Sequence, residues 1–514
     1  MSLSSSEPVI IGVGQSIDRI DAKTYKAWSA SDLAADAARA AVHDAGLGED
    51  ALRRFDAIAT TRTFEDSRPQ PAIFGKSRNF PRSVARRLGM APRYAAWAKA
   101  GGNTPQDLVN EFSERIAAGE FNLVLLAGAE AISTVRSAQA RGITLDFSED
   151  PGGEVEDRGA GLEEFRDPLM GTHGLGNPTL IYAIAENARR KRLGLTREAY
   201  ARDMGDLFAP LAAVAHSNPW SAWDVPAYGA DELTSVGPHN RWIADPYPLR
   251  LVARDQVNLG AAVLLASRQA ALDLGVPADR LVYLHGYARA VEKSFLYRPD
   301  LGASPAAAAA SRLALRYAGA GVDDVAAFDF YSCFPIAVSN VAIDAFGLSP
   351  REPRGLSVTG GLPFFGGPGN NYSMHAIAQM VEHVRKADGR PGFVGANGGY
   401  LSKYTVGLYS SAPQPWKECD SRALQAELDA VPSPEVLPVY EGRGRVESYT
   451  VHHNKEGLGY AVVVGRTADD QRFIARSAEG DRETCLQAHE QDVIEMEIDV
   501  KSLSGINSFN FLHG

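Results

Sequence analysis

Cysteine is scarce in this chain, which has only three in 514 residues: Cys333, Cys419 and Cys485. So few thiols exclude a disulfide framework and a zinc site built from four cysteines, and they fit a reducing cytoplasm. Apolar runs long enough to cross a bilayer are also missing, so we expect no membrane insertion. Residues 1–7 have neither a basic region nor an apolar core, and we therefore expect no signal peptide.

Positive charge is in deficit as well. The 52 Lys and Arg residues are outnumbered by 63 Asp and Glu residues, and the formal net charge is −11. A surface of this sign does not favour nucleic acid or anionic membranes, so neither is an expected partner. One basic run, at residues 189–192, is short enough to be a solvated helix face; a local patch for a phosphorylated ligand is the alternative interpretation.

The chain does contain a repeated order of elements. At 514 residues it is too long for one hydrophobic core, so we expect two or three domains. Apolar strands alternate with helices at residues 9–14, 32–45, 55–59, 103–118 and 122–128. The same order returns at residues 282–286, 305–318, 326–330, 373–386 and 392–396. This pattern predicts a mixed or parallel sheet covered on both faces, made from two fused copies of one βα unit.

Two further regions lie outside the repeat. Residues 133–255, called the insertion segment below, are rich in glycine, proline, charge and tryptophan. So long a segment is unlikely to be plain loop, and we expect it to cover a site. Prolines from residue 413 to residue 438 indicate a linker. The short β-branched runs that follow predict a separate small β-barrel.

Motifs in both halves resemble the thiolase superfamily. They are a glycine-rich loop at residues 360–373, a helix at 32–47, a strand region at 119–130 and a segment at 255–262. Their order over residues 8–411 is similar to that of the sterol-carrier-protein-x group and of the thiolase-like proteins of type 1. The tail resembles the OB-fold domain that partners thiolase-like enzymes.

The resemblance implies a specific architecture. It is an α/β fold of the duplicated thiolase type, with two βαβαβαββ halves layered α-β-α-β-α, a loop-domain insertion and a small C-terminal β-barrel. The first half would comprise residues 1–132 and 256–270, and the insertion residues 133–255. The second half, the linker and the OB-fold-like barrel would comprise residues 271–412, 413–434 and 435–514.

The same resemblance raises a chemical difficulty. Thiolases use a cysteine nucleophile at the start of a buried helix, a histidine, and a second cysteine that exchanges protons with the substrate carbon. The matching positions here are Gly102, Gly367 and Ala396. No shift of the alignment supplies a first-half nucleophile, because the first cysteine of the chain is Cys333. The resemblance therefore implies a thiolase scaffold without conventional thiolase activity.

Polar residues remain near the same loops. Tyr331, His375 and Tyr400 are the candidate catalytic residues, because a phenol or an imidazole can replace lost acid/base groups. Their alternative interpretation is as packed aromatics and a structural histidine. The candidate substrate-binding residues are Gly102, Asn103, Cys333, Gly367, Asn370, Asn397 and Gly398. The asparagines could donate to an oxyanion or hold tight turns, and Cys333 could be a packing residue. No residue is predicted to bind a metal.

Three functions stay open at this point. The first is a thiolase-like protein, acyltransferase-type by homology, that binds CoA or an acyl-CoA and lacks thiolase activity. The second is an aldolase or retro-aldolase that acts on a CoA thioester with tyrosine acid/base groups. The third is a non-catalytic module that binds CoA or lipid. A CoA thioester is the expected ligand in each case, no covalently bound cofactor is expected, and the protein could be a monomer or a homodimer.

Overall fold

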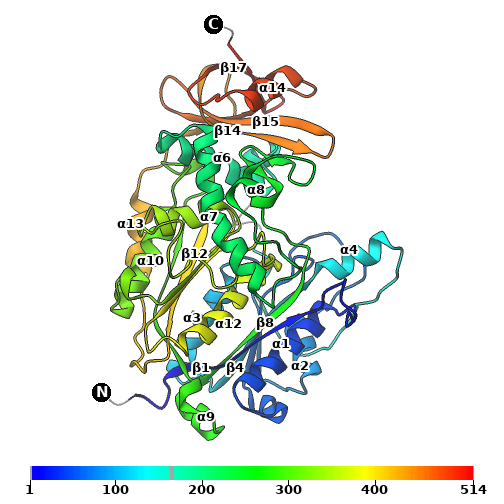
Figure 1. Cartoon of the computed structure of the whole chain (residues 1–514), viewed down its shortest axis with the longest axis vertical. Helices are drawn as coiled ribbons and strands as arrows, with labels where there is room; N and C mark the ends of the chain where they lie inside the picture. Colours follow the sequence, from blue (N-terminus) through cyan, green and yellow to red (C-terminus); the bar gives the residue numbers. More distant parts are fainter. Residues whose placement is uncertain (1–2, 162–166, 513–514) are drawn as a thin grey trace.

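The computed structural model describes residues 3–161 and 167–512 (Figure 1). Its larger sheet is built from two sets of strands that repeat one plan. The first set comprises β1 (Pro8–Ile17), β2 (Ala57–Thr60), β3 (Tyr94–Trp97), β4 (Leu123–Ala131) and β8 (Asn258–Ser267). The second set comprises β9 (Val282–Val291), β10 (Ala327–Phe330), β11 (Gly392–Gly398) and β12 (Lys403–Ser410).

Strand pairing confirms the duplication. The first set runs in the order β3-β2-β4-β8-β1, and the second in the order β10-β11-β12-β9. In each set the first strand pairs antiparallel with the last, whereas β2 pairs parallel with β4 in the first set and β10 pairs parallel with β11 in the second. The sets join where Val9 and Ile10 of β1 pair with Tyr283 and Val282 of β9. The order of apolar runs in the sequence therefore predicted the plan of both halves.

Helices cover both faces of these strands. Between the two sets lie α3 (Thr104–Ala117) and α12 (Tyr372–Val384), which contact each other and strands of both halves. The outer face of the first set is covered by α1 (Ala30–Asp44) and α2 (Phe80–Arg87), and that of the second by α10 (Pro305–Ala318). The resulting α-β-α-β-α layering is the predicted one, and it places the start of α3 in the interior.

Local sequence signals account for the helix ends. The Ser29 side chain accepts a hydrogen bond from the Asp32 backbone N–H, and the Asp32 side chain accepts one from the Ser29 backbone N–H. Helix α1 therefore begins with a capping box. The helix therefore begins at Ala30, two residues before the predicted start at residue 32. At the C-terminal end of α10, Gly319 has a left-handed backbone conformation, with φ of 67°. Residues with a side chain rarely adopt this conformation.

The insertion segment is largely helical. It contains most of α4 (Ile132–Ala140), then α5 (Pro168–Thr172), α6 (Pro178–Arg192), α7 (Arg197–Ser217) and α8 (Ala230–Thr234). Short strands β5 (Glu156–Asp157), β6 (Trp242–Ala244) and β7 (Tyr247–Pro248) complete it. Figure 1 shows α6 and α7 between the sheets of the two halves and the C-terminal strands.

All four residues of the basic run at 189–192 form ion pairs. Arg189 and Arg190 are buried and pair with Asp344 and Asp492. The remaining members of the run pair with acidic residues too: Lys191 with Glu495, and Arg192 with Asp300 and Asp344. The prediction of a solvated helix face was wrong for the two buried arginines. Their charges bind α6 to neighbouring elements.

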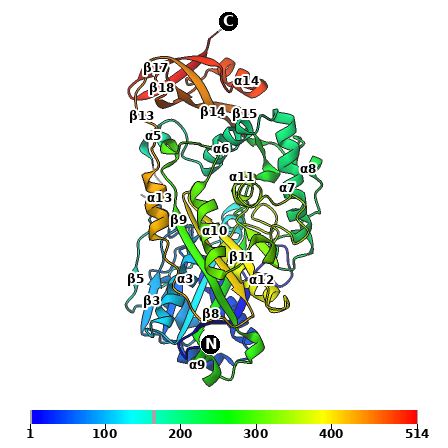
Figure 2. The same cartoon turned by 90° about the vertical axis from the view of Figure 1, so that its left-hand side faces the viewer.

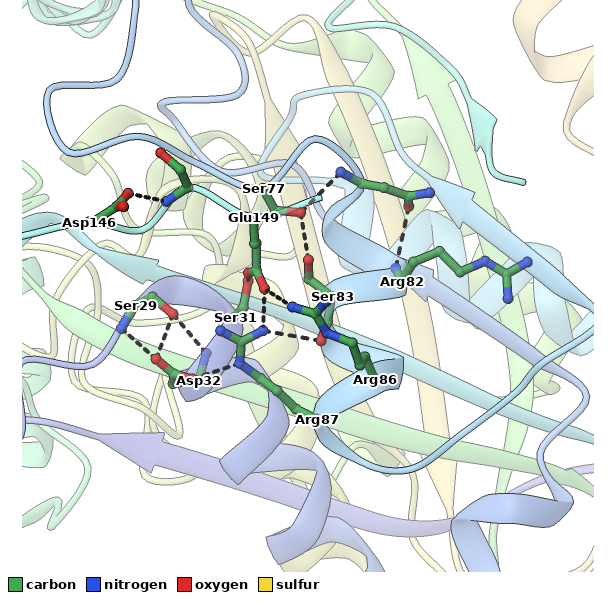
Figure 3. A network of polar contacts seen from close by, with 12 residues as sticks. Ser29, Ser31, Asp32, Ser77, Arg82, Ser83, Arg86, Arg87, Asp146 and Glu149 are labelled. Atoms are coloured by element: carbon green, nitrogen blue, oxygen red, sulfur yellow. Dashed lines mark hydrogen bonds and ion pairs between the residues drawn. The ribbon is translucent and has the colours of Figure 1, made fainter. Parts of the chain in front are cut away.

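A partly exposed carboxylate, that of Glu149, attaches the chain after α4 to the first half (Figure 3). Glu149 accepts from the Ser31 hydroxyl at 2.8 Å and from Arg87 at 2.7 Å, and it pairs with Arg86. Arg87 also bonds Asp32, so the same guanidinium connects α1, α2 and this loop. Charge-assisted bonds shared among three segments hold the insertion segment against the first half.

The C-terminal strands close into a barrel. Neighbouring pairs run from β14 (Gly442–Asn454) through β15 (Gly457–Arg466), β16 (Arg472–Arg476), β18 (Ile506–Phe511) and β17 (Glu497–Leu503) back to β14. The helix α14 (Arg482–Glu490) lies between β16 and β17 in the chain. Before the barrel come α13 (Arg422–Ala430) and β13 (Val436–Leu437). Figure 2 shows the barrel at one end of the long axis.

Polar contacts connect this barrel to the rest of the chain. Arg472 is fully buried, pairs with Glu447 and donates to the carbonyls of Leu296 and Arg298 in the second half. β6 of the insertion segment extends the barrel sheet by pairing Ala244 with His452. Among the described residues, no helix is both long and apolar enough to span a membrane.

Candidate functional site

A cavity of about 1000 Å³ lies where the two halves meet the insertion segment. Part of its wall is formed by three segments: the glycines at the start of α3, the loop after β10, and the turn after β11. The insertion segment contributes residues on α5 and α6. The sequence candidates that line this cavity are Gly102, Tyr331, Cys333, Gly367, Asn370, Asn397 and Tyr400.

The Tyr331 phenol lies where a side chain on residue 102 would have to stand. A β-carbon added to Gly102 would lie 2.2 Å from the Tyr331 hydroxyl oxygen and 2.5 Å from the Asn397 carbonyl oxygen. Real β-carbons do not come so close to other heavy atoms. A cysteine at this position therefore has no room beside the Tyr331 ring and the Asn397 carbonyl, both of which come from the second half.

Contacts with the insertion segment position the loop that carries Tyr331. This loop joins β10 to the short helix α11 (Pro335–Val338). Phe334 stacks on Tyr182 of α6 with ring centroids 4.3 Å apart. The backbone N–H of Ile336 donates to the buried carboxylate of Glu186, also on α6, at 3.0 Å. Helix α6 therefore fixes the loop from the far side of the cavity.

Asn397, at the end of β11, is held by Tyr182. Its side-chain nitrogen donates to the Tyr182 hydroxyl at 2.7 Å and lies 3.8 Å from the Cys333 sulfur. The Tyr182 hydroxyl in turn donates to the Gly399 carbonyl at 3.1 Å and accepts from the Leu401 N–H at 3.2 Å. The Asn397 side-chain oxygen is buried and, within the described part of the chain, accepts no hydrogen bond.

The glycine-rich loop before α12 reaches the cavity without a catalytic side chain. The N–H of Gly367 donates to the Arg254 carbonyl at 2.7 Å, and a β-carbon there would lie 3.2 Å from that oxygen. Asn370 accepts from the Gly101 N–H at 2.9 Å and donates to the Arg62 carbonyl at 2.6 Å. Because both ends of its amide are bonded to backbone, Asn370 holds the loops together and has little capacity left for an oxyanion.

Three sequence candidates do not line the cavity. His375 is fully buried on α12, with Nδ1 2.7 Å from the Gln15 side-chain oxygen. Burial without a charged partner lowers the pKa of His375 to about 3. Asn103 bonds Asp107 on its own helix, and a β-carbon on Gly398 would lie 1.9 Å from the Asn103 oxygen. These residues support the wall from behind, so an acid/base role for His375 has no route to a ligand in the cavity.

The side chains of Cys333 and Tyr331, which together with Asn397 are called the cavity floor below, retain their protons at neutral pH. Burial raises the pKa of the Cys333 thiol to about 12, and the nearby polar groups of Tyr182 and Asn397 only partly oppose that effect. Burial also raises the pKa of Tyr331 well above its ordinary value, and Cys333 adds to the shift. Among the described residues, the Tyr331 hydroxyl has no hydrogen-bond partner. The floor therefore offers hydrogen-bond donors rather than a thiolate or a phenolate.

Two arginines line the cavity with exposed side chains. The guanidinium of Arg254 lies 4.0 Å from the centre of the Trp223 ring, and that of Arg68 lies 5.7 Å from the Phe64 ring. No carboxylate of the described residues pairs with either arginine, while nearby Asp255 is engaged by Arg136. Free guanidinium groups at this position can bind an anionic group on a ligand.

Sequence reasoning missed Tyr182, Arg68 and Arg254. Each lies in a segment that shows no motif, and Tyr182 looks like one apolar residue in the run of α6. Only the expectation that the insertion segment covers a site could have indicated Tyr182. Across the described residues, no group of three or more His, Cys, Asp or Glu side chains could hold a metal ion.

Comparisons with known proteins agree with this geometry. The crystal structure of a monomeric SCP2-thiolase-like protein type 1 from Mycobacterium smegmatis is 40% identical; the alignment covers 99% of this chain and 100% of that one, with a TM-score of 0.85. The family model for the thiolase-like protein type 1 additional C-terminal domain matches residues 423–503. No curated protein matches the chain.

More distant structures share the fold alone. An Ltp2-ChsH2(DUF35) aldolase is 20% identical, with a TM-score of 0.56, over 79% of this chain and 98% of that one. An acetyl-CoA acetyltransferase from Syntrophomonas wolfei is 16% identical, with a TM-score of 0.54, over 79% and 99%. The chain therefore belongs to the SCP2-thiolase-like proteins of type 1 and carries the additional C-terminal domain of thiolase-like type 1 proteins.

Proposed function

We propose that this protein binds a CoA thioester in its 1000 Å³ cavity and does not transfer the acyl group by the thiolase route. The Tyr331 phenol in the space of a residue-102 side chain carries the proposal. Without a nucleophile at residue 102, no acyl-enzyme forms there. The cavity around this point is open, so loss of the nucleophile has left the space for a ligand intact.

Charge at the cavity supports a phosphorylated ligand. Arg68 and Arg254 line the cavity without carboxylate partners in the described chain, and CoA carries phosphate groups that pair with guanidinium. The protein as a whole is acidic, with a net charge of −11, so the two arginines form a local patch of positive charge on it. The apolar residues further in, including Phe334 and Leu362, suit the acyl and pantetheine portions.

Calorimetric titration with CoA and acetyl-CoA tests the proposal. We expect saturable binding to the full chain, and a loss of about tenfold in affinity when Arg68 and Arg254 are both replaced by alanine. Arg53→Ala, which removes an exposed arginine that does not line the cavity, is the matched control and should leave the affinity unchanged. Absence of binding by the unaltered protein would refute the proposal.

A coupled assay tests the chemical half of the proposal. Purified protein should not cleave acetoacetyl-CoA in the presence of free CoA, because residue 102 cannot carry the acyl group. Thiolysis that persists after contaminating thiolase has been removed would show that another residue serves as nucleophile.

An aldolase is the second candidate, and the free Tyr331 hydroxyl favours it. In a retro-aldol cleavage a base removes the proton of a 3-hydroxyl, the C2–C3 bond breaks, and its electrons form an enolate on the thioester. With its raised pKa, Tyr331 suits the donor that stabilises this enolate oxygen and does not suit the base. Release of an aldehyde from 3-hydroxybutyryl-CoA, lost in Tyr331→Phe, would establish this activity.

The protein is proposed to act as a monomer. The similar Mycobacterium smegmatis protein is described as monomeric. Light scattering coupled to gel filtration should give the mass of one 55.1 kDa chain. A mass of two chains at micromolar concentration would favour the homodimer instead.

A further inference from the structure

We propose that the floor of the cavity recognises a hydroxyl group of its ligand through the side-chain oxygen of Asn397. The inference rests on the proposed binding of a CoA thioester and narrows it to 3-hydroxyacyl groups. Asn397 lines the cavity, is only 2% exposed, and accepts no hydrogen bond at its side-chain oxygen from any described residue. A buried acceptor without a donor is costly, so a ligand that supplies the donor gains affinity.

The direction of the Asn397 amide follows from Tyr182. A phenol has one proton, and the Gly399 carbonyl at 3.1 Å can only accept it. The Leu401 N–H at 3.2 Å can only donate. The remaining contact of the Tyr182 oxygen, 2.7 Å from Asn397, is therefore one in which Tyr182 accepts and the Asn397 nitrogen donates. Reversing the amide would deprive the Gly399 carbonyl of its donor.

This orientation disfavours one of the two interpretations that the sequence left open, in which Asn397 donates to an oxyanion. Its nitrogen is taken up by Tyr182 and approaches the Cys333 sulfur, and the side-chain oxygen is the atom left over. An oxyanion or a carbonyl oxygen beside this atom would meet lone pairs. A hydroxyl group, in contrast, would donate its proton to it.

Neighbouring groups complete a site for an alcohol. The Tyr331 hydroxyl and the Asn397 backbone carbonyl both lie within 2.5 Å of the point where a β-carbon on Gly102 would stand. Because Tyr331 keeps its proton, it can donate to a ligand hydroxyl at this point, and that hydroxyl can in turn donate to an oxygen of Asn397. The cavity carboxylates Asp167 and Asp255 are bonded to the N-terminus of α5 and to Arg136, so no free carboxylate of the described lining favours an ammonium group instead.

Titration with three thioesters of equal chain length tests the inference. The probes are 3-hydroxybutyryl-CoA, butyryl-CoA and acetoacetyl-CoA, each with full-length protein in a calorimeter. We expect 3-hydroxybutyryl-CoA to bind about tenfold more tightly than the other two, the ratio that one buried hydrogen bond supplies. Equal affinities would overturn the inference while leaving CoA binding in place. If none of the three binds, the proposed function fails and the inference fails with it.

Two variants remove the recognition by different routes. Asn397→Leu deletes the acceptor, and Tyr182→Phe deletes the hydroxyl that orients it; each should reduce the tenfold ratio to about one. Tyr409→Phe is the matched control, because Tyr409 is fully buried, bonds Gln106 and does not line the cavity. Its ratio should stay near tenfold. Persistence of the ratio in Tyr182→Phe and Asn397→Leu would assign the preference to another part of the cavity.

Discussion

Residue 102 has no side chain, and the ring that occupies the space above it comes from the other half of the fold. Tyr331 is 7% exposed and packs edge-on against Tyr372 with centroids 5.3 Å apart. A packed ring cannot move aside as a flexible lysine side chain could. The Tyr331 ring therefore requires a glycine at residue 102. At the scale of single residues, the absence of a side chain at residue 102 is therefore matched by the bulk of the Tyr331 phenol.

Gly102→Ala should destabilise the protein by about 1–3 kcal/mol, because the added methyl group overlaps the Tyr331 ring. In a Tyr331→Ala background the same substitution should cost less, since the overlapping ring atoms are gone and the Asn397 carbonyl oxygen is the close contact that remains. A double-mutant cycle by urea denaturation measures this coupling. Gly48→Ala, at a glycine with open space around it and ordinary backbone angles, is the control. Additive effects of the two cavity substitutions would contradict the steric argument.

His375 makes stability depend on pH. Its folded pKa is depressed to about 3 by burial, whereas the unfolded chain takes up the proton near pH 6.5. The unfolded state binds more protons across this interval, so stability falls as the pH drops below 6.5, by up to about 1.4 kcal/mol per pH unit.

The variant His375→Gln isolates this contribution. It should lose less stability than the unaltered protein between pH 7 and pH 5, as measured by urea denaturation at each pH. His239→Gln, at an exposed histidine, controls for a general loss of imidazole. Parallel pH profiles for His375→Gln and the unaltered protein would show that His375 titrates normally in the folded state.

At the scale of elements, α6 determines where the cavity loops lie. One side of this helix supplies Tyr182 to Asn397, and the next turn supplies Glu186 to the N-terminus of α11. Glu186 also accepts the hydroxyls of Tyr200 on α7 and Tyr247 on β7. A single carboxylate thus joins four elements, and it is fully buried.

Glu186→Leu should destabilise the protein by about 3 kcal/mol, because the Tyr200 phenol and the Ile336 N–H lose their acceptor. The Tyr247 phenol keeps only a longer bond, 3.3 Å, to the Tyr182 carbonyl. Thermal unfolding should show a lower midpoint, and affinity for CoA should fall as the Tyr331 loop loses its support. Glu427→Leu, on the exposed helix α13, should change stability by no more than about 0.5 kcal/mol. A midpoint for Glu186→Leu as high as that of the control would mean that the neighbouring groups find other partners.

At the scale of the whole molecule, the barrel is attached to the two halves through buried charge. Arg472 crosses from β16 to the carbonyls of Leu296 and Arg298, and Glu447 holds its other side together with Arg466. Asn187 of α6 donates to the Tyr449 carbonyl in β14. We propose that residues 413–434 are the linker on which proteases act, and that these contacts keep the barrel docked after cleavage.

Arg472→Met should undock the barrel. Removing Arg472 should cost about 3 kcal/mol, because two buried carbonyls lose their donor and Glu447 loses one of its two arginine partners. After limited proteolysis, the fragments of the unaltered protein should co-elute in gel filtration, and those of Arg472→Met should separate. Arg482→Met, at an exposed arginine of α14, serves as control and should behave like the unaltered protein. Co-elution of the Arg472→Met fragments would place the main attachment elsewhere.

The amino-acid sequence by itself determined the duplicated fold, the helical cover and the C-terminal barrel. Apolar periodicity and glycine or serine punctuation are local properties, and residues 9–14 and 282–286 showed them as strands before any contact was known. It also determined that no cysteine precedes residue 333, so a first-half thiol nucleophile was excluded by composition alone.

Only the tertiary structure decided what each polar side chain faces. The resemblance to thiolases places His375 and Tyr331 near the same loops, but α12 turns His375 toward Gln15, while the loop after β10 turns Tyr331 into the cavity. The donor and acceptor ends of Asn397 depend on a hydroxyl from α6, a helix with no motif of its own. Such arrangements come from packing between segments that are distant in the sequence. A local sequence pattern cannot predict them, because the neighbours of each residue in space depend on the whole fold.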